Sequence, residues 1–518
     1  MCFSMSAQHD DYFECFSAID ERSAAYMACG MATESGESIV LSCTGATASR
    51  NYYPGLTEAY YRKLPVLAVT SSQFFGNVDN GFPQMIDRRK RPDDIAKTSV
   101  RVGIPHTDED RWSCSQLINK AILELEHRGG GPAHIDLETS FSSDYSVTQL
   151  PDVRTVNRIE YNKCFPSIDA TNICICIGSH AGFTQELTRL IEEFCEKYNG
   201  VVLCDHVSNY FGKYSIFPFL VLSNRNSDIK CFEPDLLIHI GEVSAYSFTG
   251  IQPKEVWRIS KDGMIRDPFK ALSSVFEMDE SVFFKHYVEE IDTYGSNDSM
   301  DYYRVWQNEY ARIIPEINVP FSNIYMAQYI KNRLPKSAIL HIGILNTNRC
   351  WNMIKPDGKY LSYCNTGGFG IDGTLSTAVG ASIVSPDKTV FVILGDLSFF
   401  YDMNALGNRH IGNNLRILIV NNGCGAEFRT PGHPGEKFGN DTGKYTAAQG
   451  HFANQSRNLV RHYAEDLGFN YLSAQSKEEF IKKCKIFLND DVLSKSIVFE
   501  TFVEHMDEYE ALRIRCDL

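Results

Sequence analysis

The sequence predicts an α/β protein built from parallel sheets in three domains, and two observations support this prediction. Short apolar runs, typical of buried parallel strands, alternate along the chain with stretches of helical pattern. At 518 residues the chain is long enough for about three domains that each bury a core of their own. We place these domains at residues 1–150, 151–310 and 311–518, each a doubly wound sheet with helices on both faces.

Composition limits the classes of partner. The net charge of -15 argues against nucleic acid and against an anionic membrane surface. The first residues, MCFSMSAQHDD, lack the basic and apolar regions of a signal peptide, and no apolar run approaches the ~18 residues of a membrane span. The 16 cysteines form no recurring pair at zinc spacing, and many lie in apolar runs. We therefore expect a cytoplasmic protein with reduced, mostly buried thiols.

In the first domain we expect strands at 39–43, 65–70 and 133–137, with helical stretches between them. A helix is expected to start near Asp20, whose side chain can cap it, and small residues run along one face of this helix. By itself Glu21 is interpreted as a solvated carboxylate in the first turn, where the helix dipole favours negative charge.

The middle of the chain carries little chemistry. Residues 151–170 form a polar link, and further strands are expected in NICICIGS, VVLCDH, DLLIHIGE and VWRIS. This part contains no GxGxxG pattern, so it offers no case for NAD or FAD. We assign it an architectural role.

The third domain contains the most informative stretch, residues 391–428. A buried strand at 391–394 ends in Gly395-Asp396, a helix is expected at 402–410, and a second strand at 415–420 ends in Asn421-Asn422-Gly423. Each ending alone is an ordinary turn. Together, in a β-α-β frame, a carboxylate and an amide at adjacent strand ends suit Mg²⁺, which usually brings a phosphate with it.

Gly-Asp followed at this spacing by Asn-Asn resembles the diphosphate–Mg²⁺ motif of the thiamine-diphosphate (ThDP) enzymes. The resemblance implies that Asp396, Asn422 and the backbone carbonyl of Cys424 bind the metal. The usual Gly after the Asp is replaced by Leu397, followed by Ser398. This variant is similar to the menaquinone-pathway branch, whose synthase joins a 2-oxoglutarate-derived unit to isochorismate. The implied cofactor-binding residues of the motif are Gly395, Asp396, Leu397, Ser398, Asn422 and Cys424.

A glycine-rich stretch at 365–380 opens a helix. This pattern is an ordinary helix entry, or a helix start whose free N–H groups receive a diphosphate. Its GIDG-LST-A-G pattern resembles the menaquinone-type synthases. The resemblance implies cofactor contacts from Gly370, Ile371 and Asp372, with Ile371 as the apolar wedge that holds ThDP bent.

The segment DERSAAYMACGMA resembles the pyrimidine-binding domain of the same family and implies that Glu21 is catalytic. A carboxylate at the aminopyrimidine ring favours the imino form that removes the thiazolium C2 proton. Gln84, in NGFPQMID, falls near the cofactor in this family. The resemblance implies the order pyrimidine-binding, middle and diphosphate-binding domain, with the cofactor between two chains of a homodimer or homotetramer.

The sequence departs from the family at several positions. Glu21 lies unusually near the first residue, so either the true start lies upstream or an edge strand and its substrate loop are missing. Several arginines hold substrate carboxylates in the menaquinone synthase, yet this chain has Gln73 after its second strand and Glu427-Phe428 in place of an apolar pair. Arg349 and Arg429 remain as carboxylate clamps or as surface residues. Our substrate-contact candidates are Thr44, Gln73, Arg349, Glu427 and Phe428.

We therefore expect a ThDP- and Mg²⁺-dependent 2-oxo acid decarboxylase or carboligase, a lyase or transferase, whose acceptor is less anionic than isochorismate, such as a sugar-like carbonyl compound. One alternative is an authentic menaquinone-pathway synthase that uses 2-oxoglutarate and isochorismate. Another is an inactive, truncated paralogue that serves as a partner subunit. Residues 429–457 are expected to form a lid. After them we expect a helix, a strand at 470–472, a helix and a strand at 496–501.

Overall fold

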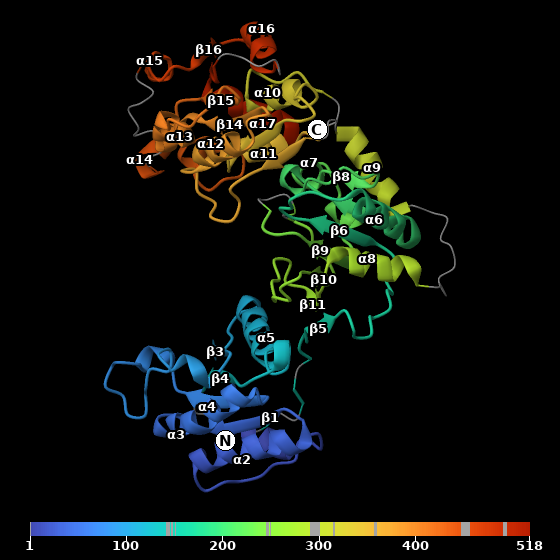
Figure 1. Cartoon of the computed structure of the whole chain (residues 1–518), viewed down its shortest axis with the longest axis vertical. Helices are drawn as coiled ribbons and strands as arrows, with labels where there is room; N and C mark the ends of the chain where they lie inside the picture. Colours follow the sequence, from blue (N-terminus) through green and yellow to red (C-terminus); the bar gives the residue numbers. More distant parts are fainter. Residues whose placement is uncertain are drawn as a thin grey trace. The chain divides into compact units, whose positions relative to one another are not determined.

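The chain forms three sheets flanked by helices, as the sequence predicts for an α/β protein (Figure 1). The computed structural model describes residues 2–140, 146, 149–150, 152–244, 248, 250–290, 301–313, 316–356, 360–446, 456–489 and 495–517. It divides into two compact units, one made of Met1–Glu160 with Gly263–Val275 and the other of Tyr161–Asp262 with Phe276–Leu518. The domain boundaries expected at residues 150 and 310 remain a prediction.

The first unit contains a four-stranded sheet in the order β1-β2-β4-β3, in which all neighbouring strands are parallel. Parallel neighbours need crossover connections, and helices supply them here. The strands are β1 (Ile39–Cys43), β2 (Val66–Ser72), β3 (Thr98–Val102) and β4 (Ala133–Glu138). The helices are α1 (Cys2–Gln8), α2 (Glu21–Ser35), α3 (Thr47–Asn51), α4 (Tyr53–Arg62) and α5 (Asp108–Leu123).

Small residues let α2 pack closely in this unit. Ala25, Ala28, Cys29 and Ala32 are its buried residues, as the sequence predicts. A Cβ placed on Gly55 of α4 would lie 2.5 Å from the Cβ of Ala25, so glycine is needed where the two helices touch. Leu67 and Val69 of β2 pack with Ala121 of α5 on the opposite face of the sheet. Both faces are therefore covered, which explains why the strands are apolar runs.

A seven-stranded sheet has the order β5-β11-β10-β9-β6-β7-β8. Its strands are β5 (Asn157–Glu160), β6 (Ile173–Ile177), β7 (Gly200–Leu203), β8 (Ser215–Ile216), β9 (Leu236–Ile240), β10 (Glu255–Ile259) and β11 (Leu272–Glu277). Its helices include α6 (Gln185–Tyr198), α7 (Pro218–Leu222), α8 (Glu280–Glu289) and α9 (Asp301–Ile313). The four strands expected in this part of the chain are all present, as β6, β7, β9 and β10.

The third sheet has six parallel strands in the order β13-β12-β14-β15-β17-β16. The strands are β12 (Ile339–Ile342), β13 (Leu361–Tyr363), β14 (Val390–Gly395), β15 (Leu415–Asn421), β16 (Asn470–Ala474) and β17 (Ile497–Phe502). The helices are α10 (Asn323–Ile330), α11 (Asn346–Asn352), α12 (Thr374–Val384), α13 (Asp396–Asp402), α14 (Thr442–Thr446), α15 (Leu459–Asp466), α16 (Lys477–Phe487) and α17 (His505–Cys516).

The strand order reverses between β12 and β14. The chain passes from β12 to β13 on one side, then crosses to β14 on the other side of β12. In open α/β sheets ligands bind at such a switch point, outside the carboxyl ends of the strands. A Cβ on Gly343, just after β12, would lie 3.1 Å from the Cα of Leu394, so a glycine keeps the two strand ends together. The topology therefore places a candidate site beyond β12 and β14.

Three expectations about this part of the chain need correction or fall partly outside the structure. The helix expected at 402–410 instead starts at Asp396 and ends at Asp402, followed by the 3-10 turn η6 (Met403–Gly407). A final helix, α17, was not expected after the last strand. Residues 447–455 of the expected lid lie outside the described residues, and the part before them contains the 3-10 segment η8 (Glu436–Asp441) and α14.

Within the described ranges, no helix combines the length and the apolar character that crossing a membrane requires. The cysteines there are free, and only Cys15, Cys164 and Cys231 are exposed. Burial raises the pKa of the interior thiols, for example that of Cys174 to about 12, so they stay protonated.

Candidate functional site

Two adjacent strand ends carry the predicted metal ligands. β14 and β15 are paired in parallel with Gly395 beside Val420, so Asp396 and Asn422 leave the sheet at the same edge. Asp396 is buried, and Asn422 directs its side-chain oxygen to the backbone N–H of Cys424 at 3.2 Å. Asn421 instead donates to Glu500 of β17 at 2.7 Å. The Asn421 oxygen also accepts the backbone N–H of Gly423 at 3.3 Å, so both asparagine oxygens lie against this loop, and the assignment of Asn422 as the metal ligand stays a prediction.

A hydrogen bond from Ser398 joins the glycine-rich segment to this edge. The hydroxyl of Ser398, in α13, donates to the carbonyl of Ile371 at 2.6 Å. This contact joins the two stretches in which cofactor contacts are predicted. A Cβ on Gly370 would lie 2.3 Å from a carboxylate oxygen of Asp372, so a larger residue at 370 would require the Asp372 side chain to move.

The start of α12 is held by a carboxylate from α13. Asp402 accepts the backbone N–H of Ser376 at 2.7 Å and the Ser376 hydroxyl at 2.5 Å. The N–H of Ser376, one of those expected to bind a diphosphate, is therefore already hydrogen-bonded to a carboxylate. The N–H groups that remain for a diphosphate are those of Thr374 and Leu375, at the start of α12. The hydroxyl of Thr374, at the first position of this helix, is buried without a partner among the described residues.

The residues at this edge fit a magnesium-bound diphosphate. A buried carboxylate, an amide oxygen and a backbone carbonyl form the all-oxygen donor set that Mg²⁺ prefers. The structure contains no group of three or more His, Cys, Asp or Glu side chains in the described part of the chain that would favour a softer metal. The helix start at Thr374 lies in the same unit and can receive phosphate oxygens.

Two of the substrate candidates pair with each other. Arg349 of α11 donates from both terminal nitrogens to the carboxylate of Glu427 at 2.6 Å each, and their side chains are only 15% and 14% exposed. Glu427 and Phe428 lie in the 3-10 turn η7 (Ala426–Arg429), and the Phe428 ring packs edge-on against His433. The sequence predicted Arg349 and Glu427 as separate substrate contacts, whereas in the structure they form an ion pair with each other.

Cys424 lines a small cavity, and no sequence pattern indicates the buried carboxylate in its wall. Glu508 of α17 is buried there and accepts the backbone N–H of Asn323 at 2.8 Å and the side-chain amide of Asn346 at 3.5 Å. Burial raises the pKa of Glu508 to about 7. The residues around the cavity include Asn346, Cys424, Arg429, His505, Glu508 and Tyr509.

The first unit carries the predicted catalytic carboxylate. Glu21 is the first residue of α2, directly after the N-cap Asp20, which accepts the N–H groups of Arg22 and Ser23. Asn51, the last residue of α3, donates to the Glu21 carboxylate at 3.2 Å. Glu21 is half-buried at the carboxyl end of β1 rather than fully solvated.

The other candidates of this unit lie on loops at the same edge of the sheet. Thr44 follows β1, Gln73 follows β2, and all three candidates, Gln84 included, are exposed. A Cβ on Gly45 would lie 3.0 Å from the carbonyl of Ser71 and 3.6 Å from that of Gln84, so the loop after β1, the end of β2 and the Gln84 turn meet closely there. Gln84 has a φ of 62°, a conformation that side chains rarely adopt.

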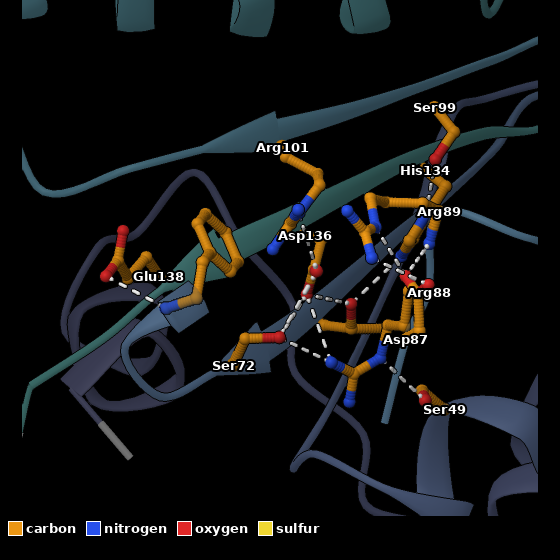
Figure 2. Close-up of polar contacts among 12 residues, drawn as sticks. Ser49, Ser72, Asp87, Arg88, Arg89, Ser99, Arg101, His134, Asp136 and Glu138 are labelled. Carbon is orange, nitrogen blue, oxygen red and sulfur yellow. Dashed lines mark hydrogen bonds and ion pairs between the residues drawn. The ribbon is translucent and has the colours of Figure 1, made fainter. Parts of the chain in front are cut away.

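A buried polar network, which the sequence analysis missed, supports these loops (Figure 2). Arg88 and Asp136 form an ion pair at 3.4 Å, with side chains 4% and 2% exposed. Ser72 and Thr70 of β2 donate to the same carboxylate at 2.9 and 3.1 Å. One signal could have indicated this network, because polar residues interrupt the apolar runs in the carboxyl halves of β2 and β4.

Comparison with known families matches both ends of the chain. Residues 2–90 match the family described as "Thiamine pyrophosphate enzyme, N-terminal TPP binding domain". Residues 343–494 match the family described as "Thiamine pyrophosphate enzyme, C-terminal TPP binding domain". The predicted catalytic residue falls in the first match and the predicted metal ligands in the second.

Full-length relatives extend this similarity. A 2-succinyl-5-enolpyruvyl-6-hydroxy-3-cyclohexene-1-carboxylate synthase of Bacteroides thetaiotaomicron is 30% identical over 517 residues, which cover 95% of this chain and 89% of the relative. The protein of the same name from Bacteroides fragilis is 29% identical, covering 98% and 92%. A solved structure, a ThDP-dependent 4-hydroxybenzoylformate decarboxylase of Rhodococcus jostii RHA1, is 16% identical with a TM-score of 0.42, over 96% of this chain and 93% of that chain.

Proposed function

Because this chain belongs to the thiamine-diphosphate enzyme family, we propose that it decarboxylates a 2-oxo acid and transfers the remaining acyl unit to an acceptor carbonyl or to a proton. The observation that carries the proposal is the shared edge of β14 and β15, where Asp396 and Asn422 leave adjacent strands. When bound, ThDP supplies the electron sink that lets the bond to the departing carboxylate break.

Each cofactor contact that the family resemblance implies has a residue in this chain. Asp396, Asn422 and the Cys424 carbonyl would hold Mg²⁺, and Ile371 would pack against the cofactor. Glu21 would hold a proton at the aminopyrimidine ring, the role for which its half-buried position and its Asn51 partner suit it. Since the family resemblance implies a cofactor held between the pyrimidine-binding domain of one chain and the diphosphate-binding domain of another, we propose assembly as a homodimer or a pair of dimers.

The names of the relatives favour a first candidate reaction. It is synthesis of 2-succinyl-5-enolpyruvyl-6-hydroxy-3-cyclohexene-1-carboxylate, for which 2-oxoglutarate and isochorismate are the substrates to test. The similarity over nearly the whole length of both chains supports this candidate over the general carboligase expected from the sequence.

One observation favours a second candidate, in which the substrates carry fewer carboxylates. Arg349 already gives both terminal nitrogens to Glu427. A substrate carboxylate that took Arg349 would leave the Glu427 charge half-buried and uncompensated, which is costly. The pair therefore favours a neutral, hydroxyl-bearing partner at this position.

The function is tested by measuring CO₂ release and products by mass spectrometry. Protein loaded with ThDP and Mg²⁺ is offered 2-oxoglutarate or pyruvate, each with and without isochorismate, beside Glu21→Gln and Asp396→Asn variants. We expect release that Glu21→Gln abolishes without loss of ThDP binding, and binding that Asp396→Asn weakens. Efficient joining of 2-oxoglutarate to isochorismate would select the first candidate. Failure to bind ThDP would contradict the proposal and favour an inactive partner subunit.

The two candidates are separated by removing the charge of Glu427. We expect Glu427→Gln to free Arg349 and to lower KM for 2-oxoglutarate relative to pyruvate about tenfold, the effect of one charge-assisted hydrogen bond. Arg349→Gln is the matched control and should not produce this gain. An unchanged preference in Glu427→Gln would show that the pair lies away from the substrate.

A further inference from the structure

The buried network in the first unit contains an ion pair, Arg88 and Asp136, that stability alone does not require. Arg88 comes from the loop between β2 and β3 and lies over the carboxyl halves of β2 and β4, as Figure 2 shows. Its ion pair with Asp136 is almost fully buried. Burying such a pair costs much of what the attraction returns, and apolar side chains of similar volume often serve stability equally well.

A guanidinium can do here what an apolar side chain cannot. Arg88 donates from Nε to the hydroxyl of Ser49 in α3 at 2.9 Å, while Nη1 donates to the hydroxyl of Ser72 in β2 and faces Asp136 of β4. Its planar fork therefore ties one helix and two strands together at fixed angles. Lysine, with a single nitrogen, cannot reach all of these partners at once.

Ser49 connects Arg88 to a strained turn by a second hydrogen bond. The Ser49 hydroxyl donates to the carbonyl of Ala46 at 2.7 Å. Ala46 has φ 59° and ψ -131°, a conformation that is strained for an L-residue and persists only where its surroundings enforce it. Arg88 is thus two hydrogen bonds away from the residue whose strain shapes the loop after β1.

The remaining nitrogen of Arg88 faces the same loop. Nη2 is buried without a partner among the described residues and lies 3.3 Å from where a Cβ on Gly45 would be. The same Cβ would approach the carbonyls of Ser71 and Gln84. The guanidinium, the loop after β1, the end of β2 and the Gln84 turn therefore meet around one glycine.

We infer that Arg88, with Asp136 as its buried partner, is a positioning residue that holds the Gly45–Ala46 turn against the Gln84 turn. The inference rests on the proposed function, because Thr44 and Gln84 in these turns are predicted substrate and cofactor contacts. Arg88 itself is not proposed to contact the substrate or the cofactor. It sets the distance between the two loops before any ligand arrives, and so acts on kcat more than on folding.

The test replaces Arg88 and Asp136 together, so that neither is left buried opposite a missing partner. Arg101, which also lies 3.9 Å from Asp136, is 33% exposed and keeps access to solvent. In the double variant Arg88→Met/Asp136→Leu we expect a melting temperature close to that of the wild type, because the pair is exchanged for apolar volume. Amide hydrogen exchange of residues 44–49 should rise about tenfold, because the strained turn loses its support. With whichever 2-oxo acid the enzyme turns over, kcat should fall at least about tenfold with a smaller change in KM.

Two single variants complete the experiment. Arg88→Lys keeps the charge but loses the fork, so it should show faster exchange at 44–49 and should not restore kcat. Arg89→Met is the matched control, since Arg89 pairs with Asp87 at the surface and should leave both readouts unchanged. If the double variant does not fold, Arg88→Lys decides, and wild-type exchange and kcat in that variant overturn the inference.

The exchange measurement separates this inference from the proposed function. If no 2-oxo acid is turned over, the proposed function fails while faster exchange at 44–49 still supports the positioning role. If turnover occurs and the double variant keeps wild-type exchange and kcat, the pair is only structural and the inference is wrong.

Discussion

At the scale of single residues, burial changes what each charged side chain does. Arg349 looks like a carboxylate clamp in the sequence, yet the structure gives both of its terminal nitrogens to Glu427. For Asp396 and Asn422, in contrast, the structure agrees with the expected placement, because the adjacent ends of β14 and β15 bring them to one edge of the sheet. A residue's type thus limits its chemistry, and its partner selects among the options.

Glu508 provides a pH prediction at this scale. Its pKa is raised from 4.5 to about 7, chiefly by burial. Between these two values the folded state binds more protons than the unfolded state, so the Glu508 contribution to stability is present below pH 4.5 and is lost as pH rises through 7. In cofactor-free protein the full effect is at most about 3 kcal/mol.

We therefore expect Glu508→Gln to gain stability relative to the wild type as pH rises from about 5 to 8. Urea unfolding of both proteins at several pH values measures the difference. A difference that does not change with pH would mean that Glu508 keeps an ordinary pKa in the folded protein.

At the scale of elements, the start of α12 depends on a neighbour. Asp402 caps the helix from α13 by accepting the N–H and hydroxyl of Ser376. Sequence patterns predict helix starts from residues that lie just before them. This cap comes from 26 residues further along the chain, so no local pattern could indicate it.

Removing this cap should affect both stability and cofactor affinity. We expect Asp402→Ala to cost about 1–3 kcal/mol, because it leaves a buried N–H unsatisfied. The loosened helix start should also weaken ThDP binding. Denaturant unfolding and ThDP titration by calorimetry measure the two effects. The exposed Asp387, substituted as Asp387→Asn, is the control and should change neither; equal losses in both variants would contradict the capping role.

At the scale of the whole molecule, the predicted catalytic and metal residues belong to different units of the chain. Glu21 lies in the first unit and Asp396 in the second. If two chains share each site, as proposed, then variants inactivated in different units can complement each other in a mixed dimer.

This arrangement predicts recovery of activity on mixing. Glu21→Gln and Asp396→Asn are each expected to be inactive alone. After they are unfolded and refolded together, random pairing should return about a quarter of the wild-type sites, since half of the dimers are mixed and each holds one intact site. Activity per site, measured beside the dimer mass from light scattering, provides the test. Dimers without recovered activity would indicate that each site is completed within one chain.

The sequence by itself determined the fold class, the strands β1, β2, β14 and β15 whose ends carry candidate residues, and the capped helix that begins at Glu21. These features follow from local pattern, because apolar runs and strand-end polar residues depend on near neighbours in the chain. The helix after Gly395 was misplaced and α17 was missed, because short helices held by tertiary packing have weak periodicity of their own.

Only the tertiary structure decided which charged residues meet. The Arg349–Glu427 pair, the Asp402 cap, buried Glu508 and the Arg88–Asp136 pair each join residues from 26 to 185 positions apart. Such pairs form where helices, loops and strand ends that are distant in the sequence pack together, and their energies depend on burial, which no local stretch of sequence specifies. The same sequence therefore predicts the location of the candidate site, while the packing around it decides how its charges are matched.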